Sequence, residues 1–154
     1  NGYTFGGGLE LALACDLRIA TEQASFSAPE VKIATVPGWG GTRRLAEAIG
    51  TAQAKQMIFT GERIGSDQAL AWGLINEAPA VDRFTERVQE IAAMIAGNAP
   101  ISVQLAKAAI DGALGGDPTM ALEAMAGALA AGTIDGREGV QAFREKRAPE
   151  FRGE

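Results

Sequence analysis

The apolar and polar positions at the start of the chain follow a short-period pattern interrupted by one helical stretch. Residues Leu9 to Cys15 are all apolar except Glu10, which predicts a mostly buried helix. Short strands are expected on either side of it, over Asn1 to Phe5, Leu17 to Ala20 and Ser25 to Ser27. This region therefore mixes α and β structure.

Helical periodicity replaces this pattern farther along the chain. Two helices are expected at Thr42 to Ile49 and Ala52 to Phe59, separated at Gly50, because a residue without a Cβ suits a helix end. A shorter helix is expected from Ser66, acting as its N-cap, to Ala71. Gly73 ends it before a strand-like Leu74 to Asn76, and four helices follow, over Asp82 to Ala96, Ile101 to Leu114, Pro118 to Ala131 and Asp135 to Lys146. The change near residue 80 divides the chain into residues 1–80, a mixed α/β part, and 81–154, a helical part.

Composition narrows the function classes. The 154 residues are 47% hydrophobic and only 6% aromatic, enough to bury one compact core with closely packed helices. The net charge is −5 and no long basic cluster occurs, which argues against nucleic acid as a partner. No apolar stretch approaches the roughly 18 to 20 residues that span a bilayer, so no membrane association is expected.

The chain has no histidine and a single cysteine, Cys15. A histidine-dependent nucleophile and a histidine-rich metal site are therefore excluded within this sequence, and no metal is expected. One cysteine allows no internal disulfide and favours a reducing, cytoplasmic compartment. Cys15 itself is interpreted as a small buried hydrophobe. Any acid–base chemistry falls to carboxylates.

The first candidate site is the run Gly6-Gly7-Gly8 followed by Glu10. Glycines let a ligand approach bare backbone N–H groups, and the helix predicted after them directs unpaired N–H groups and its positive end toward that ligand. Such a place stabilises a developing negative oxygen. The alternative is an ordinary tight turn with Glu10 in a favourable first helical turn.

The second candidate site is Glu30, in a segment between two brief extended stretches. Pro29 fixes its own φ, and Pro37 restrains the residue before it, so a rigid loop is expected to hold the Glu30 carboxylate. A glycine-rich turn, Gly38 to Gly41, follows. The alternative is a solvated glutamate, but pairing with Glu10 favours a functional role.

These segments resemble the crotonase superfamily, the enoyl-CoA hydratase/isomerase family. The resemblance covers essentially the whole chain, in order. The segments that carry it are Asn1-Gly2-Tyr3, Gly6 to Leu11, Asp16 with Ile19-Ala20, Phe26 to Glu30, Pro37 to Thr42, Thr60-Gly61 to Ala69, Gly73-Leu74, Arg137-Glu138-Gly139 and Phe143 to Arg147.

The resemblance implies an α/β fold of the crotonase type. Residues 1–80 would form part of its ββα spiral core, and residues 81–154 a helical region for trimerisation and CoA contact. The chain would be the C-terminal portion, roughly 60% of a typical member, and the missing part would supply a second oxyanion N–H. The helices over Pro118 to Lys146 are the expected oligomer surface of a homotrimer or hexamer; alternatively, they only cover their own core.

The resemblance also implies a chemistry. The Gly7 N–H would stabilise the enolate oxygen of an acyl-CoA thioester, with Gly6 beside it. Glu10 would orient and deprotonate water, Glu30 would protonate Cα, and the Gly38 N–H would steady Glu30 or the water. Coenzyme A enters as part of the substrate, so no separate cofactor is expected.

Three further residues are expected at the substrate. Trp39 would line the acyl pocket, where Phe26 is interpreted instead as core. Phe143 and Lys146, three residues apart and so on one helix face, would contact the adenine and phosphate end of CoA. A solvated helix end is the alternative interpretation of Lys146.

The activity favoured by a glutamate at both positions is enoyl-CoA hydratase. An enoyl-CoA isomerase or a specialised dehydratase is the alternative within the family, and an inactive fragment or an interaction module built from residues 82–146 is the alternative outside it. A dinucleotide-binding protein is disfavoured because the glycine spacing is not Gly-x-Gly-x-x-Gly and no βαβ unit with an acidic ribose partner is expected.

Overall fold

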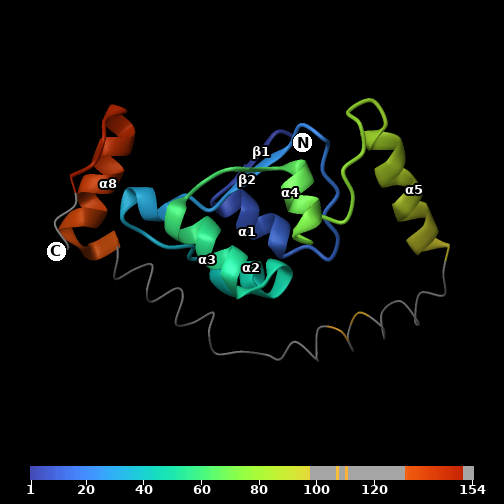
Figure 1. The fold of residues 1–154 in the computed structure, drawn as a ribbon, viewed down its shortest axis with the longest axis horizontal. Helices are drawn as coiled ribbons and strands as arrows, with labels where there is room; N and C mark the ends of the chain where they lie inside the picture. Colours follow the sequence, from blue (N-terminus) through green and yellow to red (C-terminus); the bar gives the residue numbers. More distant parts are fainter. Residues whose placement is uncertain (98–106, 108–109, 111–130, 151–154) are drawn as a thin grey trace.

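The computed structural model of this chain describes residues 1–97, 107, 110 and 131–150. Within them a small sheet and its covering helices form the centre, and two helices flank that centre at opposite ends (Figure 1). The strands are β1 (Tyr3–Phe5), β2 (Ser25–Ser27) and β3 (Ile64–Gly65). The helices are α1 (Gly7–Leu13), the 3-10 helix η1 (Glu30–Ile33), α2 (Gly41–Ile49), α3 (Thr51–Thr60), α4 (Ser66–Ala71), α5 (Phe84–Ala96) and α8 (Ile134–Glu145).

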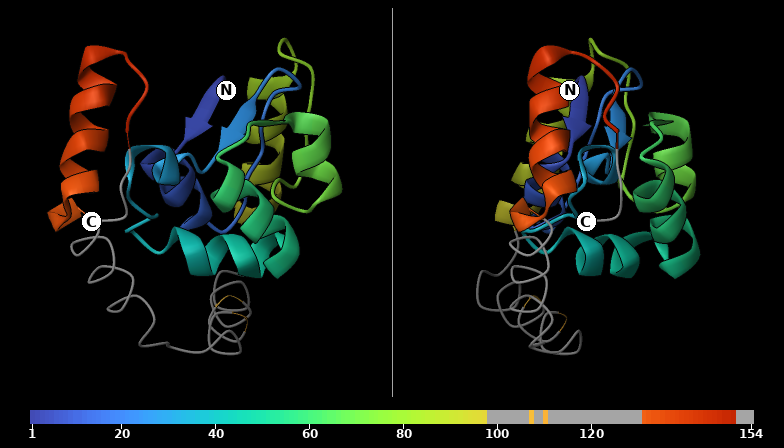
Figure 2. Two further views of the ribbon diagram at one scale, coloured as in Figure 1. Left: turned by 60° about the vertical axis from the view of Figure 1, so that its left-hand side comes forward. Right: turned by 90° about the vertical axis from the view of Figure 1, so that its left-hand side faces the viewer.

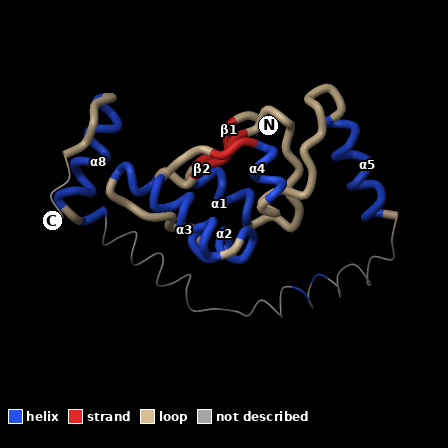
Figure 3. The backbone as a smooth tube through the Cα atoms, in the orientation of Figure 1, coloured by secondary structure: helices blue, strands red, loops and turns tan. Residues whose placement is uncertain are grey.

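The sheet has the order β1-β2-β3, with β1 parallel to β2 and β2 antiparallel to β3. Tyr3 pairs with Ser25, and Phe26 pairs with Ile64. A parallel pair needs a crossover connection, and α1 lies in the connection between β1 and β2 (Figure 3). A βαβ arrangement therefore does occur, and that part of the expectation was wrong. That no acidic ribose partner accompanies it stays a prediction, and the glycine spacing still argues against dinucleotide binding.

The core lies between the sheet and helices α1 to α4. Leu9 and Leu13 of α1 pack with Leu45 of α2, Met57 of α3 and Phe26 of β2, each less than 9% exposed. Alanines occupy many of the remaining core positions, which lets the backbones approach closely. The prediction that Phe26 belongs to the core is confirmed.

Most of the predicted helices are confirmed, including the break at Gly50, which has a φ of +82°. The predicted helices over 101–114 and 118–131 fall outside the described residues apart from Lys107, Ile110 and Ala131. The division at residue 80 stays a prediction.

Two predicted strands do not form. Residues Leu17 to Ala20 contribute one parallel bridge, between Ile19 and Glu77, and Glu77 lies one residue beyond the predicted strand Leu74 to Asn76. Backbone hydrogen bonds accompany the bridge, from the Asn76 N–H to the Arg18 carbonyl at 2.7 Å and from the Ala20 N–H to the Glu77 carbonyl at 3.1 Å. Side chains add two more: the Arg18 Nε donates to the Leu74 carbonyl at 2.6 Å, and the Asn76 Oδ1 accepts from the Arg18 N–H at 2.8 Å.

Three local expectations were also wrong. Ser66 is the first residue of α4 rather than its cap, because its hydroxyl donates to the Glu22 carbonyl at 2.5 Å. Cys15 is exposed, since α1 ends two residues before it. Glu30 opens the short 3-10 helix η1 instead of lying in a rigid loop.

The two flanking helices are attached differently. No residue in the described range of α5 is buried, and Arg87 ties that helix to Glu77 through two hydrogen bonds of 2.6 and 2.7 Å. Helix α8 packs against η1, as two further views make clear (Figure 2). Gly139 lets it approach closely, because a Cβ there would collide with the carbonyl of Ile33.

Candidate active site

The glycine run places α1 at the wall of a cavity. Gly6 adopts a φ of +53°, its N–H donates to the Ser27 carbonyl at 3.0 Å, and its carbonyl accepts from the N–H groups of Leu9 and Glu10. Gly7 is the first residue of α1, where an N–H has no intrahelical acceptor. A Cβ on Gly7 would lie 2.6 Å from the Trp39 ring, so this position requires glycine in order to seat that ring.

Glu10 is buried, with 6% of its surface exposed, and its carboxylate is fixed by two backbone donors. Its Oε1 accepts from the Trp39 N–H at 2.8 Å and from the Gly41 N–H at 2.9 Å. Gly41 is the first residue of α2, so the carboxylate lies at the positive end of that helix. Both interactions favour a negatively charged acceptor.

Glu30 has the opposite surroundings. Its Oε2 is buried without a hydrogen-bond partner. Burial raises the pKa of Glu30, and the nearby charge of Glu10 raises it further, against the opposing effect of a backbone hydrogen bond. Glu30 is therefore the carboxyl group better suited to hold a proton.

Both glutamates line one cavity of about 760 Å³. Main-chain turns, apolar side chains and one lysine complete its wall. The lining residues are Gly6, Gly7, Glu10, Pro29, Glu30, Lys32, Ile33, Thr35, Val36, Gly38, Trp39 and Phe143. The structure thus gathers the predicted residues of the first 40 positions with Phe143 of α8, about a hundred residues away in sequence.

Lys146 does not join them. Helix α8 ends at Glu145, and Lys146 is its C-cap with a left-handed φ of +56°. The prediction that Phe143 and Lys146 share a helix face was wrong, because the backbone leaves the helix between them.

The hydrogen bonds to Glu10 were not anticipated from the sequence. Gly38 lines the cavity, but the N–H groups that bind Glu10 belong to Trp39 and Gly41. The available signal was the start of α2 directly after the glycines, where N–H groups lack helical partners. A role for the Gly38 N–H toward Glu30 or water stays a prediction.

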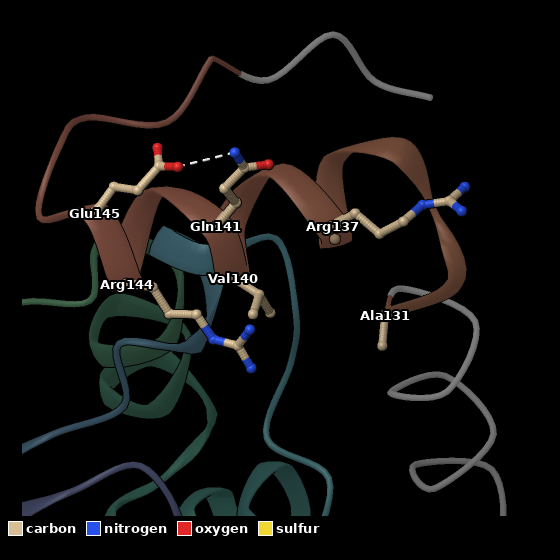
Figure 4. Close-up of a pocket in the computed structure, with 7 residues that line it drawn as sticks. Ala131, Arg137, Val140, Gln141, Arg144 and Glu145 are labelled. Carbon is tan, nitrogen blue, oxygen red and sulfur yellow. Dashed lines mark hydrogen bonds between the residues drawn. The ribbon is translucent and has the colours of Figure 1, made fainter.

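A separate cavity of about 470 Å³ lies beside α8 (Figure 4). Arg137 and Arg144 border it, and the Gln141 amide donates to Glu145 at 2.9 Å. Neither glutamate of the candidate site reaches this second cavity.

Comparison with known proteins decides the family. The family model described as "Enoyl-CoA hydratase/isomerase" matches residues 1–154. The chain belongs to this family. The α/β fold of the crotonase type is supported by solved structures, among them a carnitinyl-CoA hydratase from Mycobacterium avium with a TM-score of 0.94 and 39% identity.

Two curated relatives of this chain have names that include enoyl-CoA hydratase. The "Putative enoyl-CoA hydratase/isomerase YngF" of Bacillus subtilis is 46% identical over 99% of this chain and 60% of its own length. The "Short-chain-enoyl-CoA hydratase" of Clostridium acetobutylicum is 41% identical over 96% of this chain and 57% of its own length. The match to the M. avium structure covers 100% of this chain and 61% of that protein's chain.

The chain therefore spans about 60% of the length of relatives that it matches. The prediction that this portion is the C-terminal one is not supported by these matches. Among the residues that the structure describes, no helix combines the length and apolar character needed to cross a membrane.

Proposed function

We propose that the protein carrying this chain is an enoyl-CoA hydratase, which adds water reversibly to a 2-trans-enoyl-CoA to give a 3-hydroxyacyl-CoA. The observation that carries the proposal is the pair of glutamates at one cavity with opposite surroundings. Hydration of a conjugated double bond needs one group that takes a proton from water and another that delivers one to carbon. Two carboxyl groups whose surroundings differ suit these two tasks.

Gly7 supports the electronic part of the reaction. Its N–H, at the first position of α1 and on the cavity wall, would donate to the thioester carbonyl oxygen. As charge moves onto that oxygen, the Cβ of the enoyl group becomes open to attack by water, and an enolate forms.

The two glutamates then have separate roles. Glu10, already accepting two N–H groups, would orient the water and take its proton as the hydroxyl bonds to Cβ. Glu30, whose pKa is raised by burial, would give a proton to Cα and resolve the enolate. Gly38 is placed on the cavity wall where its N–H would steady Glu30 or the water.

The surrounding walls suit an acyl thioester. Gly6 and Trp39 would contact the acyl part, and Phe143, on α8, would contact the nucleotide end of CoA. Lys146 lies outside the lining of this cavity and would have to reach the CoA phosphates beyond it. No cofactor beyond the substrate's own coenzyme A is proposed. We further propose a homotrimer or hexamer assembled through helices of the chain's second half, and a cytoplasmic location. We also propose a spiral core in residues 1–80 and a helical region in 81–154.

An enoyl-CoA isomerase or a specialised dehydratase is the second candidate. The latter is supported by a second M. avium structure, named as a carnitinyl-CoA dehydratase, which has a TM-score of 0.93 and 36% identity to this chain. Water addition is favoured over isomerisation because two carboxyl groups share the cavity, whereas moving a double bond needs only one that shuttles a proton.

The test mixes the full-length protein with a short 2-enoyl-CoA in water. The reaction is measured as the loss of the enoyl-thioester absorbance. Wild type should consume the substrate, and both Glu10→Gln and Glu30→Gln should fail while still binding the CoA ester. Glu47→Gln is the matched control, because this glutamate pairs with Arg43 on α2, away from the cavity. Binding without hydration in wild type would favour another activity of the family, and no binding would reject an acyl-CoA enzyme.

A further inference from the structure

Arg44 occupies an unusual place for a cation. It lies in the first turn of α2, and no acidic residue lies in that first turn. A positive side chain at the positive end of a helix is electrostatically unfavourable. A local interaction is therefore needed to explain its position.

The Arg44 side chain turns back onto the residues that precede its own helix. Its Nη1 donates to the Trp39 carbonyl at 2.7 Å, and its backbone N–H donates to the Gly40 carbonyl at 3.0 Å. Gly40 has a φ of +93°, and a Cβ there would collide with the Arg44 guanidinium. The guanidinium thus occupies the space where a side chain at Gly40 would otherwise lie.

The same turn holds the candidate site from its other side. The Trp39 and Gly41 N–H groups bind the Glu10 carboxylate, while the Trp39 ring packs against Gly7. The Trp39 carbonyl therefore accepts a hydrogen bond from Arg44, its N–H donates to Glu10, and its ring packs against Gly7. Trp39 as a whole is 71% exposed, so its backbone hydrogen bonds are the main restraint on its place.

We propose that Arg44 is a positioning residue, which fixes the turn of residues 39–41 so that Glu10 and the Trp39 ring keep their places at the cavity. The inference rests on the proposed function, because it assigns Arg44 an effect on turnover through Glu10. A guanidinium can donate to a carbonyl through one nitrogen while its other atoms pack near a glycine, whereas an ammonium is a single compact donor.

The test compares Arg44→Gln and Arg44→Lys with Arg43→Gln in the full-length protein. Arg43 is the matched control: it is the neighbouring arginine in the same helical turn, but its Nε bonds Glu47 at 2.7 Å. Arg44→Gln should lower kcat by about 10²-fold with little change in KM, as expected for a misplaced reacting group. Arg44→Lys should show an intermediate loss, and Arg43→Gln should turn over like wild type.

A second readout follows the turn itself. The chain has two tryptophans, so Trp72→Phe leaves Trp39 as its fluorophore, with the same substitution applied to any tryptophan elsewhere in the full-length protein. In this background Arg44→Gln should change the emission of Trp39 and its quenching by acrylamide, and Arg43→Gln should not. Added guanidinium ion should restore part of the turnover of Arg44→Gln.

A double-mutant cycle separates this inference from the proposed function. Arg44→Gln should add little to the loss caused by Glu10→Gln, because residues acting through one group are not additive. If Glu10→Gln is inactive but Arg44→Gln has an unchanged kcat, the role of Arg44 is overturned and the proposed function is not. Full additivity would overturn the role of Arg44 as well, whereas full turnover in Glu10→Gln would overturn the carboxylate mechanism. If Arg44→Gln does not fold, the same criteria apply to Arg44→Lys.

Discussion

The regions around Glu10 and Glu30 hold their carboxyl groups by different means. Glu10 projects from α1 into the turn before α2, where two N–H groups bind one of its oxygens. Glu30 opens η1, and its buried Oε2 has no partner. Hydrogen bonds thus fix the first group as an acceptor, while burial favours the protonated form of the second.

The two regions also depend on different parts of the chain. The Glu10 region is built from residues within about the first 50, through contacts of α1 with α2. The Glu30 region is covered by α8, where Gly139 meets the Ile33 carbonyl and Ala142 is 1% exposed (Figure 2). The site therefore needs a distant helix for one of its two halves.

The largest expected effect is on turnover in Glu30→Gln. The amide cannot deliver a proton to Cα, so kcat should fall by about 10³-fold, within the range for general acid–base catalysis. Steady-state hydration of a short enoyl-CoA measures it, with Glu47→Gln as the control. Near-normal turnover in Glu30→Gln would contradict the role of the buried carboxyl group.

Gly41→Ala should disturb the other region. A Cβ at this position would lie 2.7 Å from the Glu10 Oε1 and 3.0 Å from the Pro37 Cβ, so the carboxylate or the turn must move. We expect kcat to fall by about 10²-fold, as for a small misplacement of a reacting group. Gly8→Ala is the control, since a Cβ there meets nothing within 4 Å; equal losses in both variants would mean that helix α1, not the carboxylate, had been perturbed.

Gly139→Ala should weaken the cover of the Glu30 region. The new Cβ collides with a backbone carbonyl, which cannot swing aside as a side chain can, so unfolding free energy should fall by about 1 to 3 kcal/mol. Urea denaturation measures the loss, and Val140→Ala, at a position 43% exposed on the same helix, is the control. If Gly139→Ala is as stable as Val140→Ala, close packing of α8 on η1 is not needed.

The smallest expected effect is a pH dependence of stability. Because the pKa of Glu30 is raised above its ordinary value of 4.5, the folded protein binds more protons than the unfolded chain just above that value. The contribution of Glu30 is thus fully present below pH 4.5 and is lost as pH rises through the raised pKa. Urea titrations should show the stability of Glu30→Gln, relative to wild type, increasing with pH across this window; a difference that is constant with pH would contradict the shift.

Much of this arrangement was predictable because it depends on local sequence. The glycine run before Glu10, the break at Gly50 and the helix of residues 41–49 follow from turn and capping preferences that neighbouring residues decide. Ser66 illustrates the limit, since its hydroxyl bonds a carbonyl 44 positions earlier instead of capping its own helix. A hydrogen bond to a distant residue cannot be predicted from the residues next to Ser66 in the sequence.

The sequence alone determined the family, the two glutamates and the glycines that let backbone and ligand approach closely. Only the tertiary structure decided that the Trp39 and Gly41 N–H groups bind Glu10 and that the Glu30 Oε2 is buried without a hydrogen-bond partner. It also decided that Phe143 reaches the cavity while Lys146 does not. The reason is physical: backbone preferences are set by neighbours in sequence. The surroundings of a charged group are set by whichever distant segments exclude water from it or donate hydrogen bonds to it.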